Sequence, residues 1–437
     1  MFSGEAGNFS AARQIEELRI LVSHPMTGPE IEISGNNLER QMAKRKPKSQ
    51  RRTVLQVIPT LEIGGAERGT IDVAAALVKT GWRALVVSQG GRMVPDLEAV
   101  GAEHIARPMA SKNPLQIARN VSTLRQIIEC EQVDIIHARS RAPAWSAWSA
   151  AAKAGIPFVT TYQSIYSENF PLKRLYNSVM ARGDLTIANS DYTAALIKER
   201  HGDVARRIEV VHRGVDLKVF FDQGVTGGRR EKIARDWQLE SSVKTLLLPA
   251  RLARRKGHGL LIAALAKLKL TDLPPFVCIF AGDTKGREHV VERLKQLSLR
   301  HELPEGLIRY PGHCDDMAAA YQAADIVLMP STVPEAFGRV AAEAQAMGKP
   351  VIVTDIGAVG ETVLAQPDVG AVEITGWRVA PDNPDALAAA IVQALLMSDE
   401  EIEGISKRAV EFIKQNYSVD KMTSATLRLY AGLRENR

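Results

Sequence analysis

Cysteine is scarce in this sequence. The three cysteines, Cys130, Cys278 and Cys314, lie far apart and show no C-x-x-C spacing. A disulfide framework needs an even, closely spaced set, and a structural zinc site of the C-x-x-C type needs paired thiolates. The cysteine pattern therefore argues against both, and the scarcity favours a reducing cytoplasm.

Long hydrophobic runs and aromatic residues are also lacking. No apolar run approaches the ~20 residues that cross a bilayer, which excludes an integral membrane protein. The first residues carry acids and no apolar core segment, so they do not form a secretory signal. Only 5% of the residues are aromatic and none form an aromatic-rich binding motif, so we expect no nucleic-acid partner.

Charge is not strongly one-sided. The chain has 437 residues, which favours two domains, and a net charge of +6. Residues 1–52 hold 9 Lys/Arg against 6 Asp/Glu, residues 53–215 hold 19 against 15, and residues 216–437 hold 28 against 29. The positive excess lies in the first half, where it fits an anionic membrane surface or a phosphorylated substrate equally well.

Residues 1–52 form a basic leader that we expect to be flexible and dispensable for folding, because residues 40–52 hold seven basic residues and no acid. It is either an unstructured leader, with Met42 as an alternative start, or a membrane- or partner-binding tail. After Thr53, short apolar runs alternate with amphipathic stretches, which indicates parallel sheets covered by helices on both faces. The predicted strands span 54–59, 84–88, 133–137, 158–162, 185–189, 208–212, 245–249, 276–282, 307–312, 325–330, 350–355 and 376–381.

Residues 216–243 separate these strands into two groups of six. The stretch 217–243 has no strand pattern and contains Gly227-Gly228, so we expect a connection with one helix. The pattern predicts two doubly wound domains, over 53–215 and 244–415, with a C-terminal helix at about 416–437 packing back on the first. Ligands of such sheets bind at the carboxyl ends of the strands, so we expect the site in a cleft between the domains.

Two glutamates follow the predicted strand at 325–330. Glu335 falls in the turn before a helix, and Glu343 lies eight residues later. This spacing suits a ligand with two polyhydroxyl parts, one for each carboxylate, flanking an anionic centre held by the helix N-terminus. The alternative is an ordinary pair of acids near a helix N-terminus.

Basic and glycine-rich turns follow other predicted strands. Arg251 and Lys256 lie five residues apart in a strand-to-helix turn with Gly257, an arrangement that holds a diphosphate unless the loop is merely solvated. Gly64 and Gly65 come between the first strand and a helix, where glycine lets the backbone approach a ligand. No G-x-G-x-x-G occurs there, so a nicotinamide dinucleotide site is weakly supported.

From residue 54 to 437 the chain resembles a retaining nucleotide-sugar glycosyltransferase of the GT-B fold, of the family 4 type that builds bacterial envelope polysaccharides and lipopolysaccharide. The resemblance implies an α/β architecture of two Rossmann-like doubly wound parallel-sheet domains facing across a cleft. Eight motifs in the order of the family carry it: GGAER (64–68), VDIIHARS (133–140), IANS (187–190), RGVD (213–216), ARLARRKG (250–257), AGD (281–283), PGH (311–313) and EAFG-R-VAAE (335–343).

The resemblance implies roles for individual residues. Catalytic roles fall to His137, beside the transferred sugar, to Arg251 and Lys256, on the donor diphosphate, and to Glu335, on the hexose hydroxyls; for His137 a simple strand-end position is the alternative. Glu343 matches the residue that binds the ribose hydroxyls. The remaining donor-binding positions are Gly64, Gly65, Gly282, Asp283, Gly312, His313 and the stretch Ala336, Phe337 and Gly338.

The chain departs from the family pattern at three places, which leaves the nucleotide base and the donor open. Ala358 stands where a second glycine is usual, His212-Arg213 replace a usual Pro-Asn, and AGD is not followed at once by glycine. The candidates on the acceptor side are Arg139, Arg141, Lys173 and Arg174. Their aromatic and apolar neighbours fit either an anionic membrane surface with a lipid-linked acceptor, or a core helix with a charged outer face.

The predicted reaction moves a hexose from a nucleoside-diphosphate sugar to a saccharide or lipid-linked acceptor. No D-x-D motif occurs, so we expect no metal and no cofactor, with Arg251, Lys256 and the helix N-terminus stabilising the leaving group. The alternatives are a nucleotide-sugar epimerase of similar fold and a non-enzymatic protein that binds a membrane surface. We expect a cytoplasmic enzyme with peripheral attachment to the inner membrane.

Overall fold

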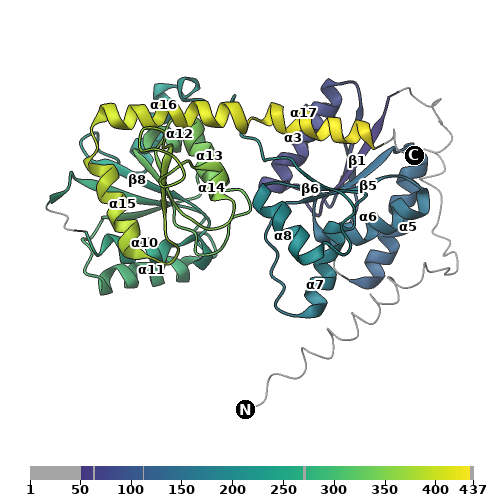
Figure 1. Cartoon of the computed structure of the whole chain (residues 1–437), viewed down its shortest axis with the longest axis horizontal. Coiled ribbons are helices and arrows are strands. Elements are labelled where there is room, and N and C mark those ends of the chain that lie inside the picture. Colours follow the sequence, from purple (N-terminus) through teal and green to yellow (C-terminus); the bar gives the residue numbers. More distant parts are fainter. Residues whose placement is uncertain (1–50, 63, 112, 269–271, 434–437) are drawn as a thin grey trace, which may run out of the picture. The chain divides into compact units, whose positions relative to one another are not determined.

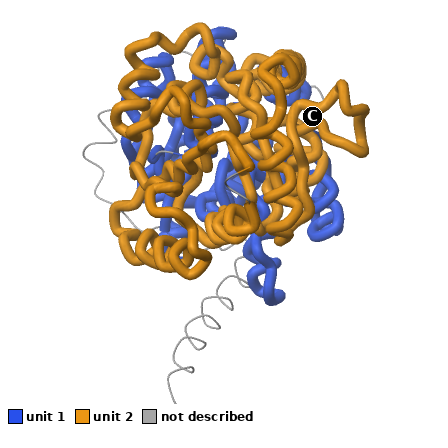
Figure 2. The backbone as a smooth tube through the Cα atoms, turned by 90° about the vertical axis from the view of Figure 1, so that its left-hand side faces the viewer, with its two compact units in different colours: residues 1–188, 194–210, 424–437 blue, residues 189–193, 211–423 orange. Residues whose placement is uncertain are grey.

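A computed structural model describes residues 51–62, 64–111, 113–268 and 272–433. The chain folds into two compact units, which Figure 2 colours separately. Among the described residues, unit 1 comprises those within 51–188, 194–210 and 424–433, and unit 2 comprises those within 189–193 and 211–423. Except for Arg51 and Arg52, the leader predicted over residues 1–52 lies outside the described residues.

Unit 1 contains a parallel seven-stranded sheet in the order β3-β2-β1-β4-β5-β6-β7. Its strands are β1 (Thr53–Val57), β2 (Arg83–Ser88), β3 (Glu103–Ala106), β4 (Ile135–Ala138), β5 (Phe158–Tyr162), β6 (Leu185–Ala188) and β7 (Ile208–Val210). The connecting segments are α3 (Gly65–Lys79), α4 (Val94–Ala99), α5 (Pro114–Cys130), α6 (Arg141–Ala154), α7 (Pro171–Ser178), the 3-10 turn η1 (Val179–Ala181) and α8 (Asp191–His201). The first three residues of α8 belong to unit 2.

The core of unit 1 follows the two-residue period of its strands. Leu55 and Val57 of β1 and Leu85 and Val87 of β2 are fully buried and belong to one hydrophobic cluster with apolar residues of α5 and α6. Strand β3 is the one that the sequence pattern missed. It forms the sheet edge, and its residues EHIA are only half-buried or exposed, so it lacks the apolar run of an inner strand.

Unit 2 contains a parallel six-stranded sheet in the order β10-β9-β8-β11-β12-β13. Its strands are β8 (Lys244–Pro249), β9 (Phe276–Ala281), β10 (Ile308–Gly312), β11 (Ile326–Met329), β12 (Val351–Thr354) and β13 (Gly376–Val379). The prediction of two doubly wound, parallel α/β units is confirmed by the two sheets.

Helices cover both faces of the second sheet, as Figure 1 shows around β8. Leu246 and Leu248 point to one face and join a core with α10 and α15, whereas Leu247 joins the opposite core with α12 and α13. The helical segments are η2 (Asp222–Gly224), α9 (Gly227–Asp236), η3 (Arg254–Lys256), α10 (His258–Leu265), α11 (Glu288–Arg300), α12 (Met317–Ala323), α13 (Arg339–Ala346), α14 (Val359–Thr362), α15 (Pro384–Leu396), α16 (Asp399–Asn416) and α17 (Val419–Gly432).

Two stretches at the predicted domain boundaries belong to helices. Residues 217–243 contain η2 and α9, and Ile233 and Trp237 there are buried in the core of unit 2. The predicted C-terminal helix is α17, whose residues up to Thr423 belong to unit 2 and whose residues from Ser424 belong to unit 1. At the start of α17, Val215 pairs with Ser418 as a parallel bridge within unit 2.

The strand order determines where each unit can hold a ligand. In unit 2 the order reverses between β8 and β11, and in unit 1 it reverses between β1 and β4. Loops at the carboxyl ends of strands diverge at such a point and leave room for a ligand. A ligand is therefore expected beside the residues that follow β8 and β11 in unit 2, and beside those that follow β1 and β4 in unit 1.

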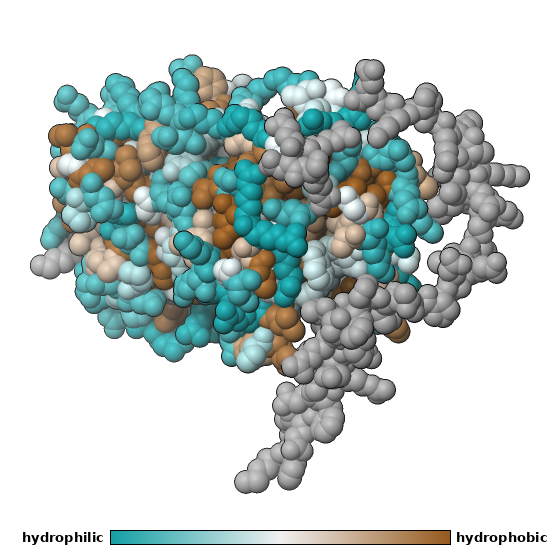
Figure 3. Space-filling view, turned by 45° about the vertical axis from the view of Figure 1, so that its right-hand side comes forward, coloured by the Kyte–Doolittle hydropathy of each residue, from teal (hydrophilic) through white to brown (hydrophobic). Residues whose placement is uncertain are grey.

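The surface carries hydrophilic and hydrophobic residues side by side on the face drawn in Figure 3. Among the residues that the structure describes, no helix is both long and apolar enough to cross a membrane.

Candidate functional site

The loop after β8 carries Arg251 and Lys256. Arg251 is exposed, whereas Lys256 ends the short turn η3 and is partly buried. Gly257 follows with a φ of +76°, and a Cβ there would lie 1.7 Å from the carbonyl oxygen of Pro330. Only glycine fits this close approach, which joins the loop after β8 to the end of β11.

Lys256 meets Glu335, which lies 79 residues further along the chain. The Lys256 Nζ lies 2.5 Å from the Glu335 Oε1, and the Ser331 hydroxyl donates to the same oxygen at 2.6 Å. The backbone of Glu335 is held by Gly357, since the two residues form a parallel bridge. The structure thus brings together two residues that the sequence assigned to adjacent parts of one ligand.

The neighbours of Glu335 keep its carboxylate charged. Burial alone would raise the pKa of Glu335, but the charge of Lys256 and hydrogen bonds from Lys256 and Ser331 outweigh it, so the pKa lies below its ordinary value. The side chains of Lys256 and Glu335 are only 18% and 16% exposed. When a ligand binds, the partly desolvated ammonium can exchange the carboxylate for phosphate oxygens, and the carboxylate can exchange the ammonium for hydroxyl groups.

Glu343 lies in α13 and is almost fully buried. Its Oε2 accepts a hydrogen bond from the Tyr321 hydroxyl at 3.1 Å, and its Oε1 lies 2.6 Å from the Arg339 Nη2. Arg339 is one helical turn before Glu343, so both side chains lie on the same side of α13. These contacts hold the carboxylate in one orientation.

The segment Ala336, Phe337 and Gly338 leads into α13. Gly338 adopts a φ of +89° as the residue before the helix, and Phe337 is buried against Tyr417. The carbonyl oxygen of Ala336 accepts a hydrogen bond from the Thr193 hydroxyl at 3.3 Å. The left-handed glycine thus marks the N-terminus of α13, where the first N–H groups of a helix have no partner within the helix.

The remaining predicted residues of unit 2 follow β9 and β10. Gly282 packs against the loop after β8, because a Cβ there would lie 2.1 Å from the carbonyl oxygen of Ala250. Asp283 is exposed and accepts a hydrogen bond from the N–H of Lys285. Gly312 has a φ of +87°, and His313 Nε2 lies 3.0 Å from Asp315 Oδ1. These residues extend the row of loops along the carboxyl edge of the sheet.

In unit 1, Gly64 and Gly65 lie where the chain turns from β1 into α3. Gly64 is the residue before the helix and has an extended backbone, and Gly65 is the first helical residue. Both are half-buried. Their position at the N-terminus of a 15-residue helix exposes unpaired N–H groups to a ligand at this edge of the sheet.

His137 has no exposed surface in unit 1. Its Nδ1 lies 2.5 Å from the Tyr430 hydroxyl and its Nε2 lies 2.7 Å from the Thr161 hydroxyl. Burial, together with the nearby charge of Arg139, lowers the pKa of His137 well below its ordinary value, so the ring is neutral at pH 7. Its assignment beside the transferred sugar stays a prediction.

Of the predicted acceptor residues, Arg139 is buried in unit 1 and Arg141 is partly buried there. Arg139 is 6% exposed, and its Nε has no hydrogen-bond partner among the described residues. Arg141 lies 4.1 Å from the ring centre of Tyr166 and donates to the Asn177 Oδ1 at 2.6 Å. The aromatic neighbours that the sequence pointed to therefore stack on Arg141.

Lys173 and Arg174 lie on α7. Lys173 Nζ is 5.9 Å from the ring centre of Phe170, and the Arg174 guanidinium donates two hydrogen bonds to the carbonyl oxygen of Arg200. Phe170 and Leu172 remain 52% and 40% exposed. Basic and apolar side chains thus share this part of the surface of unit 1.

Sequence reasoning missed Ser331, Tyr321 and Arg339 as partners of the two glutamates. Ser331 follows β11 and Arg339 is four residues from Glu343, so both contacts could have been predicted from the positions of these residues along the chain. Tyr321 lies on α12, and only the packing of α12 beside α13 brings its hydroxyl to Glu343.

Two protein families match this chain in succession. Residues 63–219 match the family described as Glycosyltransferase Family 4, and residues 229–417 match the family described as Glycosyl transferases group 1.

Individual proteins agree with these matches. A crystal structure of a glycosyltransferase from Rickettsia africae is 32% identical, covers 89% of this chain and 100% of that chain, and has a TM-score of 0.78. A D-inositol 3-phosphate glycosyltransferase of Xylanimonas cellulosilytica is 28% identical over 330 residues, which are 70% of this chain and 73% of that protein. Anabaena HepE in complex with UDP and glucose is 23% identical, covers 87% of this chain and 100% of that chain, and has a TM-score of 0.72, a likeness of fold alone.

Proposed function

The chain belongs to the GT-B glycosyltransferases, and we propose that it transfers a hexose from a nucleoside-diphosphate sugar to a saccharide or lipid-linked acceptor. The contact between Lys256 and Glu335 carries this proposal. An ammonium that binds phosphate and a carboxylate that binds hydroxyl groups lie in contact at the point where the strand order reverses. In a nucleotide sugar, the diphosphate is bonded directly to the hexose, so the group that binds phosphate and the group that binds the hexose hydroxyls must lie next to each other.

In this proposal, different residues of unit 2 bind different parts of the donor. Arg251 and Lys256 neutralise the diphosphate, whose negative charge grows as the bond to the sugar breaks. Glu335 and the N–H groups leading into α13 hold the hexose hydroxyls, and the Glu343 carboxylate, oriented by Tyr321 and Arg339, accepts from the ribose hydroxyls. The hexose retains its anomeric configuration because the acceptor attacks on the face that the diphosphate leaves.

The proposed donor site uses side-chain charge instead of a metal ion. Two cations and a helix N-terminus supply positive potential where the leaving group develops charge. Adding Mg²⁺ or Mn²⁺ to chelator-treated enzyme is expected to leave the transfer rate unchanged. A rate that depends on either ion would contradict this part of the proposal.

The acceptor is proposed as a saccharide or lipid-linked intermediate of envelope polysaccharide or lipopolysaccharide synthesis. A specific observation favours a second class, because the Xylanimonas relative is named for an inositol phosphate acceptor. A phosphorylated acceptor also fits the positive excess of residues 53–215. The two classes differ in whether lipid is needed, so one assay can separate them.

The test is incubation with UDP-, GDP-, ADP- and dTDP-hexoses while free nucleotide is measured. Each donor is tried alone, with lipid extract and with inositol 3-phosphate. We expect one donor to release nucleoside diphosphate only with an acceptor, and Lys256→Ala to reduce this release strongly. Isomerised sugar nucleotide without an acceptor would indicate an epimerase, and no consumption of any donor would contradict the proposed reaction.

We also propose peripheral attachment to an anionic membrane through α7. Phe170 and Leu172 can enter the headgroup region while Lys173 and Arg174 face anionic lipid. Sedimentation with anionic vesicles should fall in Phe170→Ser and Leu172→Ser and should weaken with salt, since the Debye length is ~8 Å at physiological ionic strength. Leu299→Ser on α11, at a residue that is 64% exposed, is the control. Equal sedimentation of all variants would show that α7 is not the membrane surface.

A further inference from the structure

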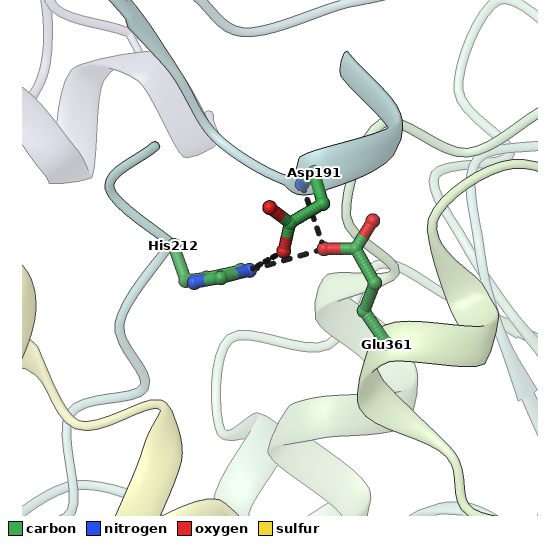
Figure 4. Close-up of side chains that lie close together, drawn as sticks. All are labelled: Asp191, His212 and Glu361. Carbon is green, nitrogen blue, oxygen red and sulfur yellow. Dashed lines mark hydrogen bonds and ion pairs between the residues drawn. The ribbon is translucent and has the colours of Figure 1, made fainter. Parts of the chain in front are cut away.

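One histidine and two carboxylates meet outside the proposed donor site, entirely within unit 2. Asp191 is the first residue of α8, His212 follows β7 and Glu361 lies in α14. The His212 Nε2 lies 3.1 Å from Asp191 Oδ2 and 3.1 Å from Glu361 Oε2, and Figure 4 shows both carboxylates directed at this nitrogen. One ligand atom from each of the three residues lies within 4.8 Å of the others.

Contacts outside the cluster hold these side chains in place. The Glu361 carboxylate accepts hydrogen bonds from the N–H groups of Asp191 at 2.9 Å and Tyr192 at 2.8 Å. Tyr417 packs edge-on against the His212 ring, with the ring centres 5.4 Å apart, and its hydroxyl donates to the carbonyl oxygen of Glu361. Such outer contacts orient metal ligands in proteins.

We propose that Asp191, His212 and Glu361 bind a zinc ion. Zinc takes nitrogen and oxygen ligands at about 2.0–2.2 Å in a tetrahedron, which places neighbouring ligand atoms about 3.4 Å apart. The two distances of 3.1 Å from Nε2 need only a small expansion to reach this value. The ion takes the place between Nε2 and the two oxygens, and any proton on Nε2 is released to solvent.

The donor set favours zinc over magnesium or calcium. Imidazole nitrogen is a good ligand for zinc, whereas Mg²⁺ and Ca²⁺ prefer oxygen atoms alone. Two carboxylates match the charge of a divalent ion. The Asp191 side chain is 71% exposed, so water can reach a fourth coordination position.

The ion would join three segments that are distant in the sequence. The zinc ion would be bound by one residue from each of residues 189–193, the stretch after β7, and α14. This shared binding stabilises the arrangement of the three segments in unit 2. The proposal goes beyond sugar transfer and does not depend on it.

The test is a titration of the metal-free full chain with Zn²⁺, against a competing fluorescent chelator, with Mg²⁺ as the comparison ion. We expect one Zn²⁺ per chain and a rise in melting temperature, with neither effect from Mg²⁺. His212→Gln, Asp191→Asn and Glu361→Gln should each weaken zinc binding by at least about 10-fold, because loss of an outer contact alone typically costs 10–100-fold.

Control variants separate the site from adventitious binding. Glu361→Gln keeps only one of the two oxygens that accept from the N–H groups of Asp191 and Tyr192, so it should melt below the parent without zinc, and added zinc should not raise its melting temperature. His289→Gln changes an exposed histidine on α11 and should leave zinc binding unchanged. Failure of the parent to bind zinc, or equal binding by the parent and all three ligand variants, would overturn the proposal, whatever the outcome of the sugar-transfer assay.

Discussion

The ion pair between Lys256 and Glu335 joins two parts of the proposed donor site at the scale of single residues. Both side chains are largely buried, so each needs the other while no ligand is bound. When a nucleotide sugar binds, Lys256 can turn to the diphosphate and Glu335 to the hexose hydroxyls. Replacing one residue therefore affects the other.

Replacing Glu335 should separate binding from transfer. Glu335→Gln removes the charge but keeps the size, so nucleoside diphosphate should bind nearly as in the parent while transfer falls about 10²-fold or more. Lys256→Ala and Arg251→Ala should weaken both, because the diphosphate that these two side chains are proposed to bind is charged before and after the bond breaks. Calorimetric titration with the free diphosphate and initial-rate assays measure the two effects. Equal loss of diphosphate affinity in Glu335→Gln and Arg251→Ala would contradict this assignment.

Gly257 tests how closely the loop after β8 must approach β11. Gly257→Ala combines a positive φ with a Cβ 1.7 Å from the Pro330 carbonyl oxygen, so it should destabilise unit 2 by more than about 2 kcal/mol and reduce diphosphate binding. Gly286 has a φ of +70° and nothing within 4 Å of its Cβ position, so Gly286→Ala should cost only about 1 kcal/mol. Thermal unfolding of both variants measures the difference, and equal losses would show that the contact is unimportant.

At the scale of elements, α13 carries Glu343, which we propose binds the ribose. The parent should bind a ribonucleoside diphosphate more tightly than the 2′-deoxy form by about 10-fold, a typical value for a hydrogen bond to a charged group. Glu343→Ala should remove this discrimination, and Tyr321→Phe should reduce it, since its hydroxyl orients the carboxylate. Titrations with both nucleotides measure the ratio. A ratio unchanged in Glu343→Ala would show that this residue does not contact the ribose.

The C-terminal helix α17 is tied to the sheet of unit 1 by Tyr430. Its hydroxyl meets the buried His137 on β4, so Tyr430→Phe leaves a ring nitrogen without a partner and should cost about 1–3 kcal/mol. Ser424→Ala, at an exposed position of the same helix, should change little. Chemical unfolding followed by the fluorescence of unit 1 tryptophans checks this, and equal stability of the two variants would contradict the role of the hydrogen bond.

At the scale of the whole molecule, buried neutral histidines should make stability depend on pH. Burial lowers the pKa of His258 from 6.5 to about 4, and burial also lowers the pKa of His137 and His201. The unfolded chain therefore takes up protons first, and stability falls as the pH drops below about 6.5. His258 alone accounts for about 3 kcal/mol of this loss, since one pKa unit corresponds to about 1.4 kcal/mol.

The matched variants are His258→Asn and His301→Asn. Asparagine cannot be protonated and can still donate to the carbonyl oxygen of Ala253, so the fall in melting temperature between pH 6.5 and pH 4 should be smaller in His258→Asn. His301 is exposed, so His301→Asn should keep the slope of the parent. Parallel curves for all three proteins would show that His258 does not contribute.

The sequence by itself determined the two doubly wound units and the loops that carry the proposed donor residues. Apolar runs such as TLLLP and VLQVIP form strands that are buried on both faces of their sheet. The glycine and charged residues in the turns after them can be recognised from the local sequence alone. The edge strand β3 escaped because an edge strand needs no continuous apolar run.

Only the tertiary structure decided which of these residues meet. Lys256 and Glu335 are 79 residues apart, and His137 and Tyr430 are 293 apart. Lys256 meets Glu335 because β8 lies beside β11, and His137 meets Tyr430 because α17 ends in unit 1. The cluster of Asp191, His212 and Glu361 likewise depends on three separate segments. Periodicity and turn residues in a sequence report local burial and local backbone geometry. These contacts depend instead on strand order and helix packing, and sequences with the same local pattern can adopt different strand orders and packings.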